Sequence, residues 1–211
     1  MLQQGWRLAV KRAVDVSCAA TGLVVAAPIV ASAALAVRAT MGSPAFFRQQ
    51  RPGLKGRLFT LVKLRTMTHG TGSDAARLTS LGRLLRAASI DELPQLWNVL
   101  IGDMSLVGPR PLLVAYLDRY SPEQSRRHDV LPGITGWAQI NGRNAVSHEE
   151  KFRLDVWYVD NWSLALDFRI LLTTIGRVIA RSNIAAGGHA TMPEFMGTPR
   201  QAEPDAQPDR S

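Results

Sequence analysis

The clearest pattern of hydrophobic and polar positions is an apolar run near the amino terminus, because no charged residue occurs from Val16 to Val37. A helix of about this length can cross the hydrocarbon core of a bilayer. Pro28 lies near the middle of the run, where it removes one helix hydrogen bond and favours a bend. Both flanks are basic, with Arg7, Lys11 and Arg12 before the run and Arg38, Arg48 and Arg51 after it.

A bent helix that enters and leaves the membrane by one face accounts for both the proline and the flanks. The tendency of basic flanks to stay in the cytoplasm places both ends on that side. A straight transmembrane helix, a buried core helix, and a secretory signal with Ala31-Ser32-Ala33 as a cleavage-like site remain alternatives. Arg12 and Asp15 are three positions apart, and we interpret them as an ordinary charge pair at the membrane interface.

Beyond residue 40 the pattern changes to short strands, helices and turn-rich loops. Apolar runs at 46–48 and 58–62 surround the turn signal Arg51-Pro52-Gly53 and predict two strands. Helical periodicity predicts helices at 78–86, 93–100, 112–120, 122–130, 148–160 and 164–181, with loops at 68–77, 102–111 and 131–144. The fold class is therefore α+β and mainly helical. We divide the chain into a membrane segment (1–40), a globular domain (41–194) and a disordered polar tail (195–211).

An aromatic cluster next to the last amphipathic helix has two interpretations. Trp157, Tyr158 and Trp162 could lie at a membrane–water interface, where aromatic side chains are enriched. They could equally fill the core of a small domain, which needs large side chains. The sequence leaves both interpretations open.

Charge narrows the choice of partners. The formal net charge is +8, which favours nucleic acid, anionic lipid or phosphorylated substrates. No signature of a nucleic-acid-binding fold occurs, so we expect no nucleic acid partner. Cys18 is the single cysteine of the chain, which excludes an internal disulfide and a cysteine-rich zinc site.

The adjacent acids Asp91 and Glu92 are the main candidates for chemistry, but they also fit a helix start. Ser89 and Glu92 have the spacing of a capping box. Pro94 complicates that interpretation, because proline has no N–H to bond back to Ile90. A helix that begins at Pro94 is equally consistent, and it places the two carboxylates just before a helix amino terminus.

Phosphoryl transfer chemistry suits these two carboxylates if cations lie nearby. Adjacent carboxylates can hold Mg²⁺ together with substrate phosphates, and a carboxylate can attack phosphorus. Arg86 precedes the pair by about one helical turn, and Arg110 lies on a backbone stiffened by two flanking prolines. Lys63 ends a strand-like run and could point into the site, although a solvent-facing lysine on an edge strand is the common alternative.

Taken in order, these motifs resemble the bacterial sugar transferase family of small monotopic phosphoglycosyl transferases. The resemblance covers roughly residues 7–196 and is closest to the short enzymes that begin bacterial N-linked glycan assembly. The matching segments are Lys11-Arg12-Ala13-Val14-Asp15, Arg51-Pro52-Gly53, Lys63-Leu64-Arg65-Thr66-Met67, residues 91–100, residues 102–105, Gly108-Pro109-Arg110-Pro111, residues 132–136 and Asn141-Gly142-Arg143-Asn144.

The resemblance implies an enzyme and a role for each matching residue. Asp91 would attack the β-phosphate of a UDP-sugar, displace UMP and carry a covalent phosphosugar, which polyprenyl (undecaprenyl) phosphate would then take. Glu92 would assist, with Asp91 and Glu92 as ligands of a Mg²⁺ cofactor. Lys63, Arg86 and Arg110 would hold phosphates, and Arg143 would help to bind the nucleotide.

The resemblance also implies a location and a substrate class. Residues 41–194 would form the catalytic domain, with a small β element and amphipathic helices at the membrane interface. Residues 1–40 would form a re-entrant helix–break–helix with Pro28 at the break. The enzyme would lie in the bacterial inner membrane, among its lipids, with the active site facing the cytoplasm and an N-acetylated UDP-sugar as donor. A non-catalytic adaptor that binds polyprenyl phosphate or anionic lipid is the alternative, but it leaves Asp91 and Glu92 unexplained.

Overall fold

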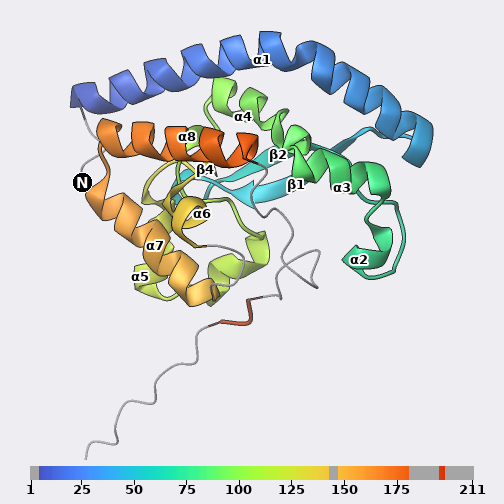
Figure 1. Ribbon diagram of the computed structural model, residues 1–211. Helices are drawn as coiled ribbons and strands as arrows, with labels where there is room; N and C mark the ends of the chain where they lie inside the picture. Colours follow the sequence, from blue (N-terminus) through green and yellow to red (C-terminus); the bar gives the residue numbers. More distant parts are fainter. Residues whose placement is uncertain (1–4, 143–146, 181–194, 198–211) are drawn as a thin grey trace, which may run out of the picture.

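Helices dominate the computed structural model, which describes residues 5–142, 147–180 and 195–197 (Figure 1). Within these ranges the strands form two small sheets, an antiparallel β1–β2 pair and a parallel β3–β4 pair. The predicted mainly helical fold with a small β element is confirmed. The α-helices are α1 (Gly5–Met41), α2 (Asp74–Arg77), α3 (Ser80–Ala87), α4 (Gln95–Ile101), α5 (Pro122–Ser125), α6 (Trp137–Asn141), α7 (His148–Asn161) and α8 (Leu164–Ile179). The 3₁₀ helices are η1 (Leu54–Gly56), η2 (Ile90–Glu92), η3 (Val114–Arg119) and η4 (Arg126–Asp129), and the strands are β1 (Phe46–Pro52), β2 (Leu58–Leu64), β3 (Ser105–Val107) and β4 (Gly133–Thr135).

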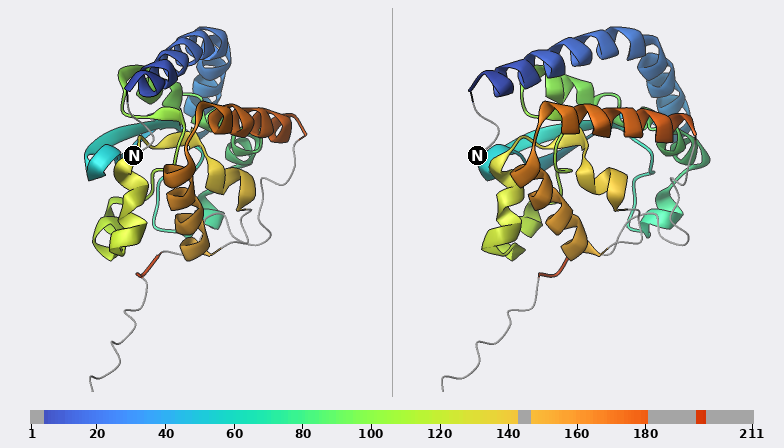
Figure 2. Two further views of the ribbon diagram at one scale, coloured as in Figure 1. Left: turned by 90° about the vertical axis from the view of Figure 1, so that its left-hand side faces the viewer. Right: turned by 60° about the vertical axis from the view of Figure 1, so that its left-hand side comes forward.

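The long helix α1 lies across one side of the molecule and bends along its length (Figures 1 and 2). Pro28 lies inside it, so the backbone remains helical through the position predicted as a break. Only 11% of its most apolar 18-residue stretch is buried. The buried side chains recur at helical spacing and form one face: Lys11, Asp15, Ala19, Ala26, Ala33 and Val37. α1 therefore touches the rest of the protein along a narrow stripe and leaves an apolar surface exposed.

The start of α1 is attached to the body by polar side chains. Arg12 donates hydrogen bonds to the carbonyl oxygens of Val99 (2.6 Å) and Leu100 (2.9 Å) near the end of α4. Asp15 is buried and accepts a hydrogen bond of 3.0 Å from the backbone N–H of Leu106. The predicted Arg12–Asp15 interfacial pair is therefore wrong, because each side chain satisfies a backbone group of another element instead.

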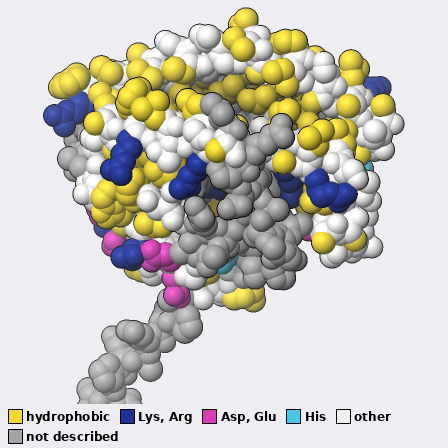
Figure 3. Space-filling view, in the orientation of Figure 1, with side chains coloured by type: hydrophobic (Ala, Val, Ile, Leu, Met, Phe, Trp, Pro, Cys, Tyr) yellow, Lys and Arg dark blue, Asp and Glu magenta, His cyan; other side chains and the backbone are white. Residues whose placement is uncertain are grey.

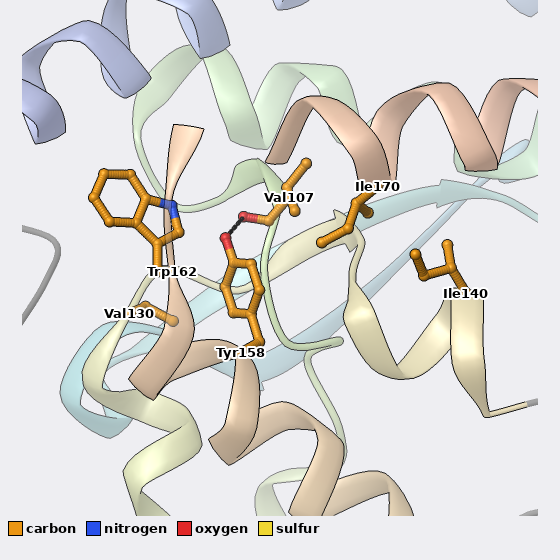
Figure 4. Close-up of a cluster of buried hydrophobic side chains, with 6 residues drawn as sticks. All are labelled: Val107, Val130, Ile140, Tyr158, Trp162 and Ile170. Carbon is orange, nitrogen blue, oxygen red and sulfur yellow. Dashed lines mark hydrogen bonds between the residues drawn. The ribbon is translucent and has the colours of Figure 1, made fainter. Parts of the chain in front are cut away.

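A buried polar network next to this attachment joins α1 to α7 and α8. The ammonium group of Lys11 donates to Asp167 (2.7 Å) and to the carbonyl oxygen of Val107 (3.1 Å). Tyr158 donates to Asp167 (2.7 Å) and to the same Val107 carbonyl (3.2 Å), which Figure 4 shows within the surrounding apolar cluster. Trp162 donates its indole N–H to Asp167 at 3.0 Å. Tyr158 and Trp162 are thus core residues.

Trp157 differs from its two aromatic neighbours. Its side chain is 41% exposed and stacks on Trp137, with the ring centroids 4.6 Å apart. Of the two interpretations of the aromatic cluster, the core interpretation therefore holds for two of its three members.

The end of α1 is held by Arg65, which directly follows β2. Its guanidinium donates hydrogen bonds to the carbonyl oxygens of Met41, Gly42 and Ser43. These bonds satisfy backbone carbonyls that have no partner within the helix. Both ends of α1 are consequently fixed to the same body.

The β1–β2 hairpin confirms the two strands predicted around Arg51-Pro52-Gly53. Cross-strand partners share a face of an antiparallel pair, and the register pairs Phe47 with Lys63 and Arg51 with Phe59. Phe59 and Leu61 are buried in a core cluster with Met104 and Val99, so this face points inward. Lys63 and Arg51 therefore lie on the inner face of the hairpin, near opposite ends.

The loops predicted at 102–111 and 131–144 are wrong in part, since they contain β3, β4 and α6. The strands have only three residues each and stand among glycines and prolines, so they give little periodic signal. Their contact requires glycine, because a Cβ atom on Gly133 would lie 2.1 Å from the backbone nitrogen of Gly108. The pairing is set by this close backbone approach.

Three other segments differ from their predictions. The loop at 68–77 contains the short helix α2, capped by Ser73. The segments 112–120 and 122–130 are largely 3₁₀, as η3 and as α5 followed by η4. The helices predicted at 78–86, 93–100, 148–160 and 164–181 correspond to α3, α4, α7 and α8. Phe195, placed in the predicted tail, is buried against Tyr116 and Phe152, whereas residues 198–211 lie outside the described ones.

One side of the molecule gathers apolar side chains over α1 and α8, with lysine and arginine side chains below them (Figure 3). On α8 the exposed members Phe168, Leu172 and Ile175 follow helical spacing, whereas Ile170 on the other face is fully buried. An exposed apolar surface of this kind marks an interaction site, and a neighbouring row of basic residues suits anionic lipid.

Candidate active site

Asp91 and Glu92 lie in η2, between α3 and α4. Ser89 has a left-handed backbone (φ 55°) and its side chain caps nothing, so the capping box suggested by sequence is wrong. α4 begins at Gln95, directly after Pro94, as the second interpretation of the sequence predicted. The chain thus turns sharply after α3 and presents the two carboxylates just before the next helix.

Close packing of α3 on the segment that follows β2 brings Arg86 to this turn. A Cβ atom on Gly82 would lie 1.9 Å from the carbonyl oxygen of Thr66, so only glycine allows this approach. One turn later, the Arg86 Nε donates to the Thr66 hydroxyl at 3.0 Å. The Arg86 charge also acts on Asp91, whose ionised form it favours.

Two cations hold Glu92. Lys63 donates to Oε1 at 2.8 Å, and Arg110 contacts both carboxylate oxygens. Burial alone disfavours an ionised carboxylate, but the charges of Arg110 and Lys63 outweigh it and hold the pKa of Glu92 well below its usual range. The structure therefore brings Lys63, Arg110 and Glu92 together, and Lys63 is not the solvent-facing side chain of the alternative interpretation.

Asp91 stands beside this group without a partner of its own. Its residue is 7% exposed, and across the described ranges no hydrogen bond or ion pair involves its carboxylate. Burial and the adjacent Glu92 charge raise the pKa of Asp91, and the charges of Lys63, Arg86 and Arg110 oppose that rise. The result is a poorly solvated carboxylate with a raised pKa, and no cation of the described residues contacts it directly.

Arg110 is fixed through its backbone by residues that sequence reasoning missed. Arg127 is 2% exposed and donates to the Arg110 carbonyl oxygen at 2.7 Å. It also donates to buried Asp155 at 2.6 and 3.1 Å and to the Tyr120 hydroxyl at 3.2 Å. Arg127 is 17 positions from Arg110 and 28 positions from Asp155, so no local sequence pattern could have revealed these contacts.

Two more cations lie within electrostatic range of Arg110. They are Arg51 on β1 and Lys151 on α7, and the charge of Arg110 lowers the pKa of each in addition to the larger effect of burial. The sequence offered Arg51 only as part of a turn motif and a basic flank. Arg143, predicted to help bind the nucleotide, lies outside the described residues, so its role stays a prediction.

A separate hollow of about 430 Å³ lies on the outer face of the hairpin. Arg48, Thr60 and Val62 line it from the hairpin, and Trp97 and Asp103 line it from the other side. Neither Asp91 nor Glu92 borders it. The charged cluster, and not this hollow, is the candidate active site.

This arrangement suits chemistry at phosphorus. The Asp91 carboxylate has no partner in the described ranges and is available to attack, and the neighbouring cations are placed to neutralise phosphoryl oxygens. A comparison with known families decides the class of protein. The profile described as bacterial sugar transferase matches residues 6–181. The chain belongs to the bacterial sugar transferase family.

Curated relatives of this family member agree with the assignment. A protein of Bacillus subtilis named uncharacterized sugar transferase EpsL is 54% identical over 194 residues, which are 89% of this chain and 96% of the relative. A Caulobacter vibrioides protein named UDP-glucose:undecaprenyl-phosphate glucose-1-phosphate transferase is 44% identical over 82% of this chain and 71% of its own length. A Salmonella typhimurium protein named undecaprenyl-phosphate galactose phosphotransferase is 36% identical over 81% of this chain and 40% of its own length.

Proposed function

We propose that this family member transfers a sugar 1-phosphate from a UDP-sugar to undecaprenyl phosphate, with UMP as the other product. One observation carries the proposal: within the part of the chain that the structure describes, the Asp91 carboxylate has no partner and lies beside Glu92, which Lys63 and Arg110 hold. The printed activities of the Caulobacter and Salmonella relatives support it.

The reaction proceeds in two displacements at one phosphorus atom. An oxygen of Asp91 attacks the β-phosphorus of the UDP-sugar, the bond from that phosphorus to the bridging oxygen breaks, and UMP leaves with the electron pair. A phosphate oxygen of undecaprenyl phosphate then attacks the phosphosugar on Asp91, and the carboxylate leaves. The covalent intermediate lets a water-soluble donor and a lipid acceptor use the site in turn.

Arg110 and Lys63 take the same part in these steps. Both contact Glu92, so they are held in place before substrate arrives and need little reorganisation during the reaction. Their remaining N–H groups can donate to the oxygens of the transferring phosphoryl group. Glu92 is thus the carboxylate that positions cations, while Asp91 is the carboxylate that reacts.

We assign Asp91 and Glu92 as the protein ligands of Mg²⁺. The donor set fits, because Mg²⁺ takes one or two carboxylates and completes its shell with substrate phosphates and water. Asp91 has no competing partner among the described residues, and Glu92 keeps lone pairs beyond those that Lys63 and Arg110 occupy. When bound, Mg²⁺ would offset charge on the phosphates of the donor.

The form of α1 supports the proposed membrane placement. Its bend, its exposed apolar surface and the fixation of both ends to one body support a re-entrant helix with Pro28 at the bend. A helix that crossed the bilayer would separate its ends by the membrane, whereas Lys11 near one end and Met41 at the other both contact the catalytic body. We therefore assign the protein to the bacterial inner membrane, with the active site on the cytoplasmic side.

The candidate donors are N-acetylated sugars and unmodified hexoses. The sequence resemblance favours an N-acetylated sugar, whereas the names of the relatives contain glucose and galactose. A panel of UDP-glucose, UDP-galactose and their N-acetylated counterparts, scored by UMP release, identifies the donor.

The test of the function uses the purified protein in lipid nanodiscs, with Mg²⁺ and no acceptor. We expect one UDP-sugar of the panel to give a burst of UMP and a sugar phosphate that stays on the protein. Asp91→Asn should abolish both signals, and Asp160→Asn, which changes an exposed carboxylate paired with Arg126, should retain them. Normal turnover by Asp91→Asn would refute the nucleophile, and lipid binding without UMP release from any donor would favour the adaptor.

A further inference from the structure

Arg51 is a cation of the inner hairpin face with no assigned purpose. It lies opposite Phe59, whereas Lys63 lies opposite Phe47, so the two cations are four residues apart along the hairpin. At about 3.4 Å per residue this separates their backbones by roughly 13 Å. Arg51 therefore reaches the charged cluster from the end remote from the Lys63–Glu92 contact.

The guanidinium of Arg51 has no acidic partner in the described part of the chain. Its one hydrogen bond there goes from Nη2 to the side-chain oxygen of Gln49, at 2.6 Å. Its Nε is buried and has no acceptor among the residues that the structure describes. The other arginines near the site are better satisfied, since Arg110 binds Glu92 and Arg127 binds Asp155.

The surroundings of Arg51 increase the cost of its charge. Burial lowers its pKa, and the positive charge of Arg110 lowers it further, while the nearby Tyr116 and Tyr120 act in the opposite sense. A partly buried cation without a counter-ion is costly unless an anion joins it. A side chain whose pKa is perturbed by burial and by a neighbouring charge is a candidate for a functional site.

The geometry points to a second phosphate subsite, formed by Arg51 beside Arg110, which holds a phosphate other than the one attacked by Asp91. This inference rests on the proposed function and adds a substrate contact to it. A guanidinium presents a planar fork that matches two phosphate oxygens, and the free Nε of Arg51 belongs to that fork.

Two phosphates of the reaction have the required chemistry. One is the α-phosphate of the donor, which leaves as UMP, and the other is the phosphate of the polyprenyl acceptor. The two-displacement reaction separates them in time, so the same purified enzyme can be tested for each.

The experiment measures each half-reaction on Arg51→Gln, Arg51→Lys and Arg48→Gln. Arg48 is the matched control, because it is an arginine of the same strand whose side chain is exposed on the outer face. The first arm follows UMP release from the UDP-sugar without acceptor. The second arm isolates the phosphosugar-bearing enzyme and follows its discharge by short-chain polyprenyl phosphate. Thermal melting of the same nanodisc preparations checks that each variant is folded.

We expect Arg51→Gln to lower kcat/KM by about 10- to 100-fold in one arm, mainly through KM, since a charge-assisted hydrogen bond is lost. A defect in the first arm assigns the UMP phosphate, and a defect in the second assigns the acceptor phosphate. Arg51→Lys should lie between Arg51→Gln and the wild type, and Arg48→Gln should stay within about twofold of it.

Three results would overturn the subsite. The first is a folded Arg51→Gln with both arms within about twofold of the wild type. The second is an equal loss in Arg48→Gln. If Arg51→Gln does not fold, the third result takes its place: wild-type KM values for both substrates in Arg51→Lys. A wild-type enzyme that released no UMP from any donor would instead contradict the proposed function itself.

Discussion

Replacing Arg127 by Met tests whether the buried Arg127–Asp155 pair both stabilises the fold and positions Arg110. The change removes two hydrogen bonds to Asp155 and one to the Arg110 carbonyl, and it leaves a carboxylate that is 3% exposed without its cation. Breaking such a buried pair costs about 3–5 kcal/mol. For a chain of this size each kcal/mol lowers Tm by roughly 2–4 °C, so we expect a fall of about 6–20 °C in thermal melting.

The double variant Arg127→Met/Asp155→Leu separates stability from positioning. It removes the uncompensated charge, so most of the lost Tm should return. The Arg110 carbonyl still lacks its donor, so UMP release should stay at least about tenfold below the wild type. Arg153→Met, which disrupts an exposed pair with Glu150, should change the free energy of unfolding by less than about 1 kcal/mol. Recovery of both Tm and UMP release in the double variant would refute the positioning argument.

Three further predictions concern the site, the pH dependence of stability and the membrane topology. Glu92→Gln should lower kcat/KM for UMP release by about 100-fold, because Lys63 and Arg110 lose their shared anion. Glu123→Gln, which changes an exposed carboxylate, should leave kcat/KM unchanged. Equal rates of UMP release in the two variants would contradict the role of Glu92. Burial, and secondly the Arg127 charge, lower the pKa of His128 from 6.5 to about 4. Between pH 6.5 and pH 4 the His128 side chain is therefore protonated in the unfolded chain and neutral in the folded chain. The contribution of His128 to the free energy of unfolding is therefore complete above pH 6.5 and falls toward pH 4 by up to about 1.4 kcal/mol per pH unit. His128→Gln should remove this slope in melting curves, and an unchanged slope in that variant would disprove the prediction. In a Cys18→Ala background, needed because Cys18 is exposed, Gly5→Cys and Ser43→Cys should react with an impermeant maleimide from the same side of the membrane, and labelling from opposite sides would indicate a spanning helix.

Sequence reasoning found the candidate carboxylate pair because its signal is local. Asp91, Glu92 and Pro94 stand within four residues, and the proline restricts how a helix can begin there. Arg110 between two prolines and Lys63 at a strand end are also short patterns, and the structure brings both to Glu92. Patterns of this length can be recognised in the sequence without knowledge of the fold.

The supporting residues could not be predicted, because their partners are remote in sequence. Lys11 meets Asp167 across 156 positions, and nothing around either residue indicates the other. For Arg12 and Asp15 the sequence predicted a contact that does not form. Helical spacing suggested a charge pair, but each side chain binds a backbone group of a distant element instead. Buried polar contacts of this kind depend on tertiary packing, which local periodicity does not encode.

The attachment of α1 at both ends has a consequence for how the enzyme meets bilayers of different thickness. A segment that returns to its own side enters only one leaflet, so it need not match the distance between the two lipid surfaces. In the re-entrant placement proposed above, the contacts of Lys11 and Arg65 within the protein would set the depth of Asp91 relative to the headgroups, and that depth would be the same in a thin membrane as in a thick one.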